Sequence, residues 1–421
     1  MTSNTTPRFV TVHMVQNHVP ANLNRDDLGA PKSAYFGGVL RARISSQCLK
    51  RSIRRSDIFA PLCGGIRTRR LAELISGGEQ KLMKKALKTL KPTLEKPDEK
   101  KSNEKKSNKS EEDEKSPSEL KLAVYLPAYS ISRLQELIRN ADDQEFRNAL
   151  EEELTKSPLP PDVALFGRML ETTELSDTKV EAACQVAHAL STHESIPEVD
   201  YFTAVDDVPG ADAGAAFLDE AGYVSACFYK FFSIDLNQLV KNLTPKEGSE
   251  SEKLPAPEKL AANTVVTFIR AAALSTPSGK RNAFAHFDPP AAIIVELRDF
   301  PLNYANAFAK PIPRDSQSLV AESVACLMKF AEECRQSFNA PSQRYVWILQ
   351  APYAEDLPQL SDDGTTHRVN SFDELLAAVA NSLGYTLDEL RDAVLPENMR
   401  CDNLLRNHAA NKLANQSTAQ E

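Results

Sequence analysis

The chain has 421 residues, 42% of them hydrophobic, and a formal net charge of −8. This is enough apolar material for a sizeable core and enough length for more than one domain. No apolar run approaches the length of a bilayer-spanning helix, and the first residues, MTSNTTPRFV, lack the basic and apolar regions of a secretory signal.

The seven cysteines are odd in number and widely scattered, and no CxxC pair occurs. This pattern favours reduced thiols over a disulfide framework and argues against a thiolate zinc site. We therefore expect a cytoplasmic protein that has no membrane association, metal or cofactor.

The first predicted element is a strand over Arg8–Val15, where RFVTVHMV is rich in β-branched and apolar residues. The segment that follows has an unusual charge pattern, because no acid occurs between Asp27 and Asp57. Seven cations lie in that gap: Lys32, Arg41, Arg43, Lys50, Arg51, Arg54 and Arg55. Such a local cationic excess in an acidic chain indicates a surface for a polyanion.

The end of this basic segment predicts a helix that begins at Ser45 or Ser46, both good N-cap residues. Leu49 and Ile53 repeat at i,i+4 as a buried stripe. Three hydrogen-bond donors share another face: Gln47, Lys50 and Arg54. Donors in this arrangement suit a sugar-phosphate backbone, although a solvated helix face with surface ion pairs is the alternative.

The next region, from about Cys63 to Thr178, is predicted to be a helical insertion. Leu71–Leu90 and Tyr125–Leu154 have helical patterns. Between them, residues 95–119 contain no apolar residue except proline and are predicted to be disordered.

After the insertion, strands and helices alternate. Further strands are predicted over Gly222–Ile234, Ala292–Leu297 and Tyr345–Leu349. Helices are predicted over Leu260–Leu274 and Ser318–Phe338, followed by two that start at capping boxes, at Ser371 and Thr386. Gly384 is placed to end the first of these two, and the tail after Asn407 is polar.

Two motifs could carry chemistry. Pro277–Arg281 (PSGKR) departs from a nucleoside-triphosphate loop, because Leu274 stands where the first glycine belongs and Arg281 replaces the Ser/Thr ligand. It remains either a turn whose two cations contact a phosphate or an ordinary turn. His13 and His18 could act as general bases on RNA, but no second acid-base partner lies at a telling spacing.

Two further segments contain residues that are candidates for contacts with a nucleic acid. Arg168 and Met169 follow a glycine. Tyr201, Phe202 and Thr203 open a stretch dense in Gly, Ala and Asp that is typical of an exposed excursion. Its aromatic residues either wedge against nucleobases or anchor the loop to the body.

Several segments together resemble the CasC family, the backbone subunit of the type I-E CRISPR surveillance complex Cascade. The resemblance covers most of residues 8–310. It rests on LNRDD…K…FGG…R.RISSQ.LKR..R at Leu23–Arg54, GRM at Gly167–Met169, AHALSTH at Ala187–His193, D.FTAVDD at Asp200–Asp207, FYKF at Phe228–Phe231, PSGKRNAFAHFDP at Pro277–Pro289 and PLNYANAF at Pro301–Phe308.

The resemblance implies an α+β fold: a ferredoxin-like (RRM-like) palm with a helical fingers insertion and a thumb hairpin. It divides the chain into palm with the basic helix (1–62), fingers (63–178), palm (179–198), thumb (199–222), palm with C-terminal helices (223–407) and a polar tail (408–421). It also implies a non-catalytic subunit that polymerises head to tail along the CRISPR RNA and kinks it, leaving bases free to pair with target DNA. Other Cascade subunits would be partners.

Carried over by motif, the resemblance implies an RNA-binding set: Asn24, Arg25, Lys32, Ser45, Gln47, Lys50, Arg51, Arg54, Arg168, Met169, Tyr201, Phe202, Thr203, Lys280 and Arg281. Tyr201 stands where the family has tryptophan. Two other functions stay open: a CRISPR RNA endoribonuclease of related fold that uses His13 or His18, and a scaffold that binds only protein.

Overall fold

A computed structural model describes residues 7–94, 119–120, 123–169, 178–204, 217–246, 254–313, 315–338, 341, 343–349, 364–402 and 405. The chain divides into two compact units. We call residues 1–59, 184–236 and 265–390 the sheet unit, and residues 60–183, 237–264 and 391–421 the helical unit.

The sheet unit is built on a ten-stranded sheet with the order β12-β11-β10-β1-β9-β7-β3-β2, in which β6 and β8 also pair with β9. Paired strands in this sheet are antiparallel except β11 and β12, which are parallel. The strands are β1 (Phe9–Ala21), β2 (Ser33–Phe36), β3 (Val39–Ile44), β6 (Cys184–Val186), β7 (Ala189–Ser191), β8 (Glu198–Ala204), β9 (Phe217–Asp235), β10 (Ala292–Arg298), β11 (Gln343–Ile348) and β12 (Thr366–Val369).

The helices of the sheet unit include α1 (Ser46–Arg54), α9 (Arg281–Phe284), η4 (Tyr304–Phe308), α10 (Leu319–Ser337), α11 (Phe372–Ser382) and α12 (Leu387–Arg391). β1 lies between β9 and β10, and its apolar residues from Val10 to Val15 are buried. Val15 packs in one cluster with Ile294 of β10 and with Leu327 and Met328 of α10. The mixed sheet with its helices confirms the α+β prediction.

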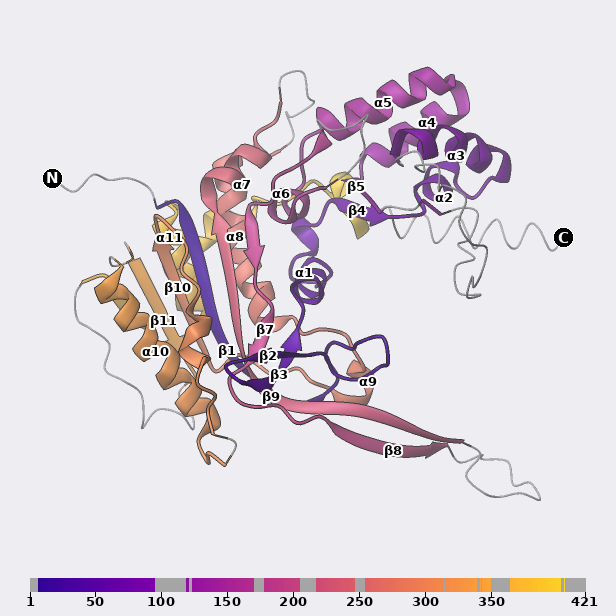
Figure 1. Ribbon diagram of the computed structural model, residues 1–421. Coiled ribbons are helices and arrows are strands. Elements are labelled where there is room, and N and C mark those ends of the chain that lie inside the picture. The colour runs from indigo at the N-terminus through magenta and orange to yellow at the C-terminus, as the bar shows by residue number, and fades with distance from the viewer. Residues whose placement is uncertain are drawn as a thin grey trace, which may run out of the picture. The chain divides into compact units, whose positions relative to one another are not determined.

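A long hairpin extends from this sheet (Figure 1). The 19-residue β9 pairs with β1 up to Val224 and with β8 from Tyr223 to Phe217. The strand that the sequence predicts over Gly222–Ile234 is therefore longer, because its first residues form a ladder with β8. Part of the predicted thumb, residues 205–216, lies outside the described residues.

The helical unit contains a two-stranded sheet of β4 (Gly65–Thr68) and β5 (Val124–Pro127). Its helices include η1 (Ala60–Leu62), α2 (Leu71–Ser76), α3 (Gln80–Leu94), α4 (Ser130–Asn140), α5 (Asp143–Thr155), α6 (Pro161–Phe166) and η5 (Glu397–Met399). Two more helices, α7 (Leu236–Leu243) and α8 (Pro257–Leu274), belong in part to each unit.

Two helix predictions in this unit are wrong in detail. The predicted helix over Leu71–Leu90 is two helices, because Gly77 and Gly78 adopt left-handed backbone angles with φ of 64° and 88°. The predicted helix over Tyr125–Leu154 begins instead with β5 and is interrupted before α5, whose N-cap Asp142 forms a capping box.

The predicted disordered segment, residues 95–119, lies outside the described residues except for its last member. Glu119 forms ion pairs with Arg69 and Arg70. The capping box at Thr386 is confirmed, and Gly384 follows α11 with φ of 86°. Ser371 is the N-cap of α11, but Glu374 accepts from the Asn370 N–H and not from that of Ser371, so the predicted box there is only half formed. No helix within the described ranges is both long and apolar enough to cross a membrane.

A charged cluster is buried in the sheet unit. The Glu296 carboxylate accepts hydrogen bonds from Arg298 Nε at 2.6 Å and Arg344 Nε at 2.7 Å, and Tyr304 Oη also lies at 2.9 Å. Burial alone raises the pKa of Glu296, but His13, whose Nε2 lies 3.7 Å from a carboxylate oxygen, and the charges of Arg344 and Arg298 hold that pKa well below its usual range. The cluster therefore carries an ionised carboxylate inside the core.

Candidate nucleic-acid interface

The basic helix α1 begins at Ser45, as the sequence predicts. The Ser45 hydroxyl accepts a hydrogen bond from the Cys48 backbone N–H at 3.3 Å, and Asn24 Oδ1 accepts one from the Ser45 N–H at 2.9 Å. Leu49 and Ile53 are buried, which confirms the predicted apolar stripe. Asn24 and Ser45 thus fix the start of the helix.

The outer faces of α1 carry the predicted donors. Gln47 and Arg51 are exposed, and Lys50 and Arg54 are half-buried. The first turn contains no acid. Lys32 is held at the same end of the helix, because its backbone bonds to Asn24 and Arg43. An anion at this surface would therefore meet cations and amide donors without a competing carboxylate from the first turn of α1.

One cation of the basic segment does not contribute to the surface. Arg41 is fully buried, and its guanidinium donates to the backbone carbonyls of Phe36, Ser191 and Phe308. It fixes the turn at Gly37, where a Cβ would lie 1.8 Å from the Ala309 carbonyl oxygen. The sequence alone could not separate this structural arginine from its neighbours.

The turn that carries Lys280 and Arg281 lies against the segment before α1. A Cβ on Gly279 would lie 2.5 Å from the Asn22 carbonyl oxygen and 2.8 Å from that of Leu23. The glycine therefore permits close backbone packing, and the two cations following it are brought beside Asn24 and the helix.

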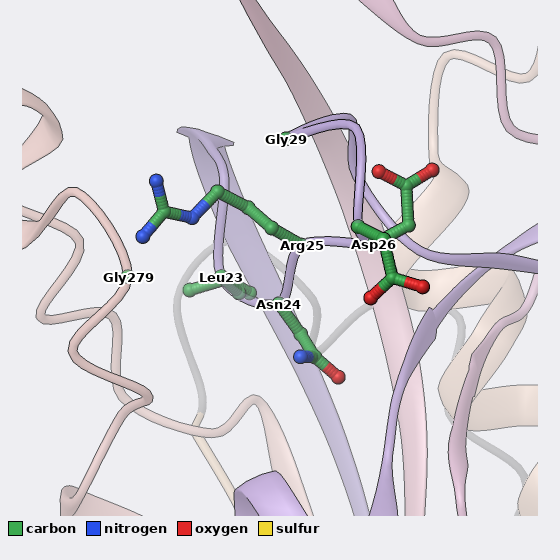
Figure 2. A pocket seen from close by; sticks show the side chains of 7 residues that line it. Leu23, Asn24, Arg25, Asp26, Gly29 and Gly279 are labelled. Atoms are coloured by element: carbon green, nitrogen blue, oxygen red, sulfur yellow. The ribbon is translucent and has the colours of Figure 1, made fainter. Parts of the chain in front are cut away.

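A shallow cavity of about 480 Å³ marks this junction, and its lining includes Asn24, Arg25 and Gly279. Figure 2 shows the Arg25 side chain extending toward the side on which Gly279 lies. Asp26 also lines the cavity, but its Oδ1 accepts hydrogen bonds from the N–H groups of Leu28 and Ala30. The structure thus brings Asn24, Arg25 and the basic turn together.

A row of polar side chains, Asp288, His18 and Lys230, fixes the end of the loop that follows the Lys280–Arg281 turn. His18 Nδ1 lies 3.1 Å from Asp288 Oδ2, and Lys230 Nζ lies 3.5 Å from His18 Nε2. Burial lowers the pKa of His18 to about 4, although Asp288 acts to raise it. These contacts require a neutral imidazole that donates to Asp288 and accepts from Lys230.

The contacts of the buried His18 with Asp288 and Lys230 predict that the protein loses stability in mild acid. The pKa of His18 in the folded protein lies below its ordinary 6.5, so the unfolded chain binds the proton first. The stabilisation is complete above about pH 6.5 and is lost as the pH falls toward 4. Urea denaturation of wild type and His18→Gln should show a difference in free energy of unfolding that shrinks over this window. A difference independent of pH would contradict the assignment.

The hairpin separates two residues that the sequence grouped. Tyr201 and Phe202 are consecutive in β8, so their side chains point to opposite faces of the hairpin. Lys280 Nζ lies 5.9 Å from the Phe202 ring centroid, which places this ring beside the basic turn. Tyr201 is 66% exposed on the other face. The Thr203 side chain lies outside the described residues.

The two RNA-binding candidates of the helical unit, Arg168 and Met169, differ in their exposure to solvent. Arg168 is buried, and its guanidinium donates to the backbone carbonyls of Tyr125, Leu154 and Thr178. The prediction that Arg168 binds RNA is therefore wrong: its donors organise the fold. Met169 is 71% exposed and available to a partner.

The histidines of the alternative endoribonuclease are both buried in the sheet unit. His13 and His18 are 0% exposed. His13 stacks on Tyr304, with 4.1 Å between ring centroids, and its Nδ1 lies 2.9 Å from Tyr229 Oη. Neither imidazole can reach an RNA hydroxyl in this conformation. Within the described ranges, no group of three or more His, Cys, Asp or Glu residues is arranged to hold a metal ion.

Fold and surface together define an α+β protein whose sheet unit presents a capped basic helix, a basic turn and a projecting hairpin. The model of the CT1975-like protein family matches residues 10–378, so the chain belongs to that family. No curated protein matches the chain.

Among solved structures, the chain resembles a chain of "CRISPR RNA-guided surveillance complex, pre-nicking". The TM-score is 0.67 at 28% identity, with 89% of this chain and 100% of that chain covered. It also resembles a chain of "CRISPR RNA-guided surveillance complex" with a TM-score of 0.53 at 24% identity, over 89% of this chain and 99% of that chain. This second likeness shows a shared fold.

Proposed function

We propose that the protein is the non-catalytic backbone subunit of a type I-E Cascade complex. It binds the CRISPR RNA, polymerises head to tail along it with other copies, and contacts the other Cascade subunits. Target DNA meets the protein through the RNA. Membership of the CT1975-like family and the likeness to a surveillance-complex chain over its whole length support this proposal.

The observation that carries the proposal is the continuous donor surface of the sheet unit. The outer faces of α1, the Asn24–Arg25 segment and the Lys280–Arg281 turn meet there. Lysine, arginine and glutamine side chains of this kind bind phosphates and sugars and leave the base edges unread. This is the chemistry needed to hold a guide strand of any sequence.

In this proposal the sheet unit is a ferredoxin-like palm, the helical unit supplies the fingers, and the β8–β9 hairpin is the thumb that kinks the RNA. Phe202 is placed to contact the RNA beside the basic turn, because its ring lies near Lys280. Burial of His13 and His18 argues against the endoribonuclease alternative.

The test is to mix the purified protein with a radiolabelled CRISPR RNA and follow it on native and denaturing gels. We expect a ladder of complexes that grows with protein concentration and an RNA that stays intact. Cleaved RNA would contradict the non-catalytic role. A single complex at all concentrations would contradict polymerisation, and absence of binding would favour a scaffold that binds only protein.

A further inference from the structure

A second cavity, of about 450 Å³, lies in the sheet unit between α1 and residues 274–287. Three guanidinium-bearing residues line it: Arg51 and Arg55 from α1, and Arg281 from the basic turn. Arg51 and Arg55 are spaced i,i+4 and share a face of the helix that is offset from that of Lys50 and Arg54. The cavity thus has cations of its own, and Asp57 is the carboxylate residue in its lining.

Two polar atoms in this lining have no hydrogen-bond partner among the residues that the structure describes. The Thr276 hydroxyl is buried, with the residue only 2% exposed, and it bonds to nothing. Arg281 Nε is also unpaired, although Nη2 of the same guanidinium donates to the Thr276 carbonyl at 2.5 Å. Buried donors without partners are rare in native proteins, and both of these belong to residues that line the cavity.

An exposed aromatic ring borders the same cavity. Phe287 lines it and is 67% exposed, and the Arg281 Cζ atom lies 5.5 Å from its ring centroid. A phenylalanine this exposed gains little from burial within its own chain. A ring next to a guanidinium is a stacking platform for a nucleobase.

We propose that this cavity binds one nucleotide, with its phosphate held by Arg51, Arg55 and Arg281 and its base stacked on Phe287. The volume lies within the range of small-molecule pockets. The nucleotide can belong to the bound RNA, in which case the inference rests on the proposed function, or it can be a free mononucleotide. The site shares Arg51 and Arg281 with the donor surface of the proposed function, and adds Arg55 and an aromatic ring that stacks on the base.

The experiment uses the full-length protein and three probes: uridine monophosphate, inorganic phosphate, and a short single-stranded RNA that contains 4-thiouridine. Titration calorimetry measures the mononucleotide, and photocrosslinking with peptide mapping locates the RNA base. The variants are Phe287→Leu, which removes the ring, and Arg55→Gln, with Phe338→Leu as control because Phe338 is also exposed but lies outside the cavity.

We expect uridine monophosphate to bind wild type, and each cavity variant to bind about tenfold more weakly, while Phe338→Leu is unchanged. A crosslink at Phe287 identifies the nucleotide as part of the RNA, whereas nucleotide binding without a crosslink identifies a free mononucleotide.

Two results separate this inference from the proposed function. Tight RNA binding without nucleotide binding or a Phe287 crosslink overturns the pocket alone. Nucleotide binding by a protein that does not bind RNA supports the pocket while the proposed function fails. Equal affinity for inorganic phosphate and uridine monophosphate, unchanged in Phe287→Leu, also overturns the base-stacking role.

Discussion

Replacing Lys50 and Arg54 together by alanine is expected to weaken RNA binding by at least about 100-fold at moderate salt, since each charge-assisted contact contributes about 1.5–3 kcal/mol. The slope of log affinity against log salt should also decrease by about 1.4, because each lost phosphate contact on a single strand removes about 0.7. Both residues lie on the outer side of α1, whose core contacts come from Leu49 and Ile53. The fold should therefore survive the change.

Fluorescence anisotropy at several salt concentrations measures both quantities. The matched control is Lys329→Ala with Arg368→Ala. These two exposed cations belong to the same unit but lie on α10 and β12. An unchanged slope in the α1 variant would mean that Lys50 and Arg54 make no phosphate contact. An equal drop in the control would mean that net charge and not the helix surface governs binding.

Replacing Glu296 by glutamine is expected to lower the free energy of unfolding by about 3–5 kcal/mol, because the change leaves buried charges uncompensated. Arg298 and Arg344 both donate to the carboxylate and are only 3% and 1% exposed. Urea denaturation followed by circular dichroism gives the change.

Asp373→Asn is the control for this variant, because it breaks an exposed ion pair with Arg270 and should cost less than about 1 kcal/mol. Equal losses in the two variants would show that the buried network contributes no more than a surface pair. Recovery of stability in a Glu296→Gln protein with Arg344→Met would support the account, since it removes one unpaired charge.

Much of the fold is visible in the sequence because its signals are local. The N-caps at Ser45 and Ser371, the stripe of Leu49 and Ile53, and the capping box at Thr386 each depend on residues within one or two turns. The break between α2 and α3 at Gly77–Gly78 is equally local, but the sequence pattern does not predict it because the apolar periodicity continues across the two glycines.

The candidate site was predicted less completely, because exposure depends on distant contacts. Arg41 and Arg168 read as surface cations, yet the carbonyls they bind include those of Phe308 and Tyr125, far away in the sequence. The sequence does not predict that Phe287 and Arg55 line one cavity, for the same reason. The one available signal was that Arg55 follows Arg51 by four residues in the predicted helix.

The continuity of β9 has a mechanical consequence. The strand runs without a loop from its ladder with β1 into the projecting β8–β9 hairpin, which we call the arm. No loop in β9 separates the arm from the sheet. The pairing with β1 is irregular only between His18 and Ala21, beside the residue that holds the loop of the basic turn. We therefore expect a displacement of the arm to reach the contact between His18 and Asp288, and through it the loop that carries the cations of the turn.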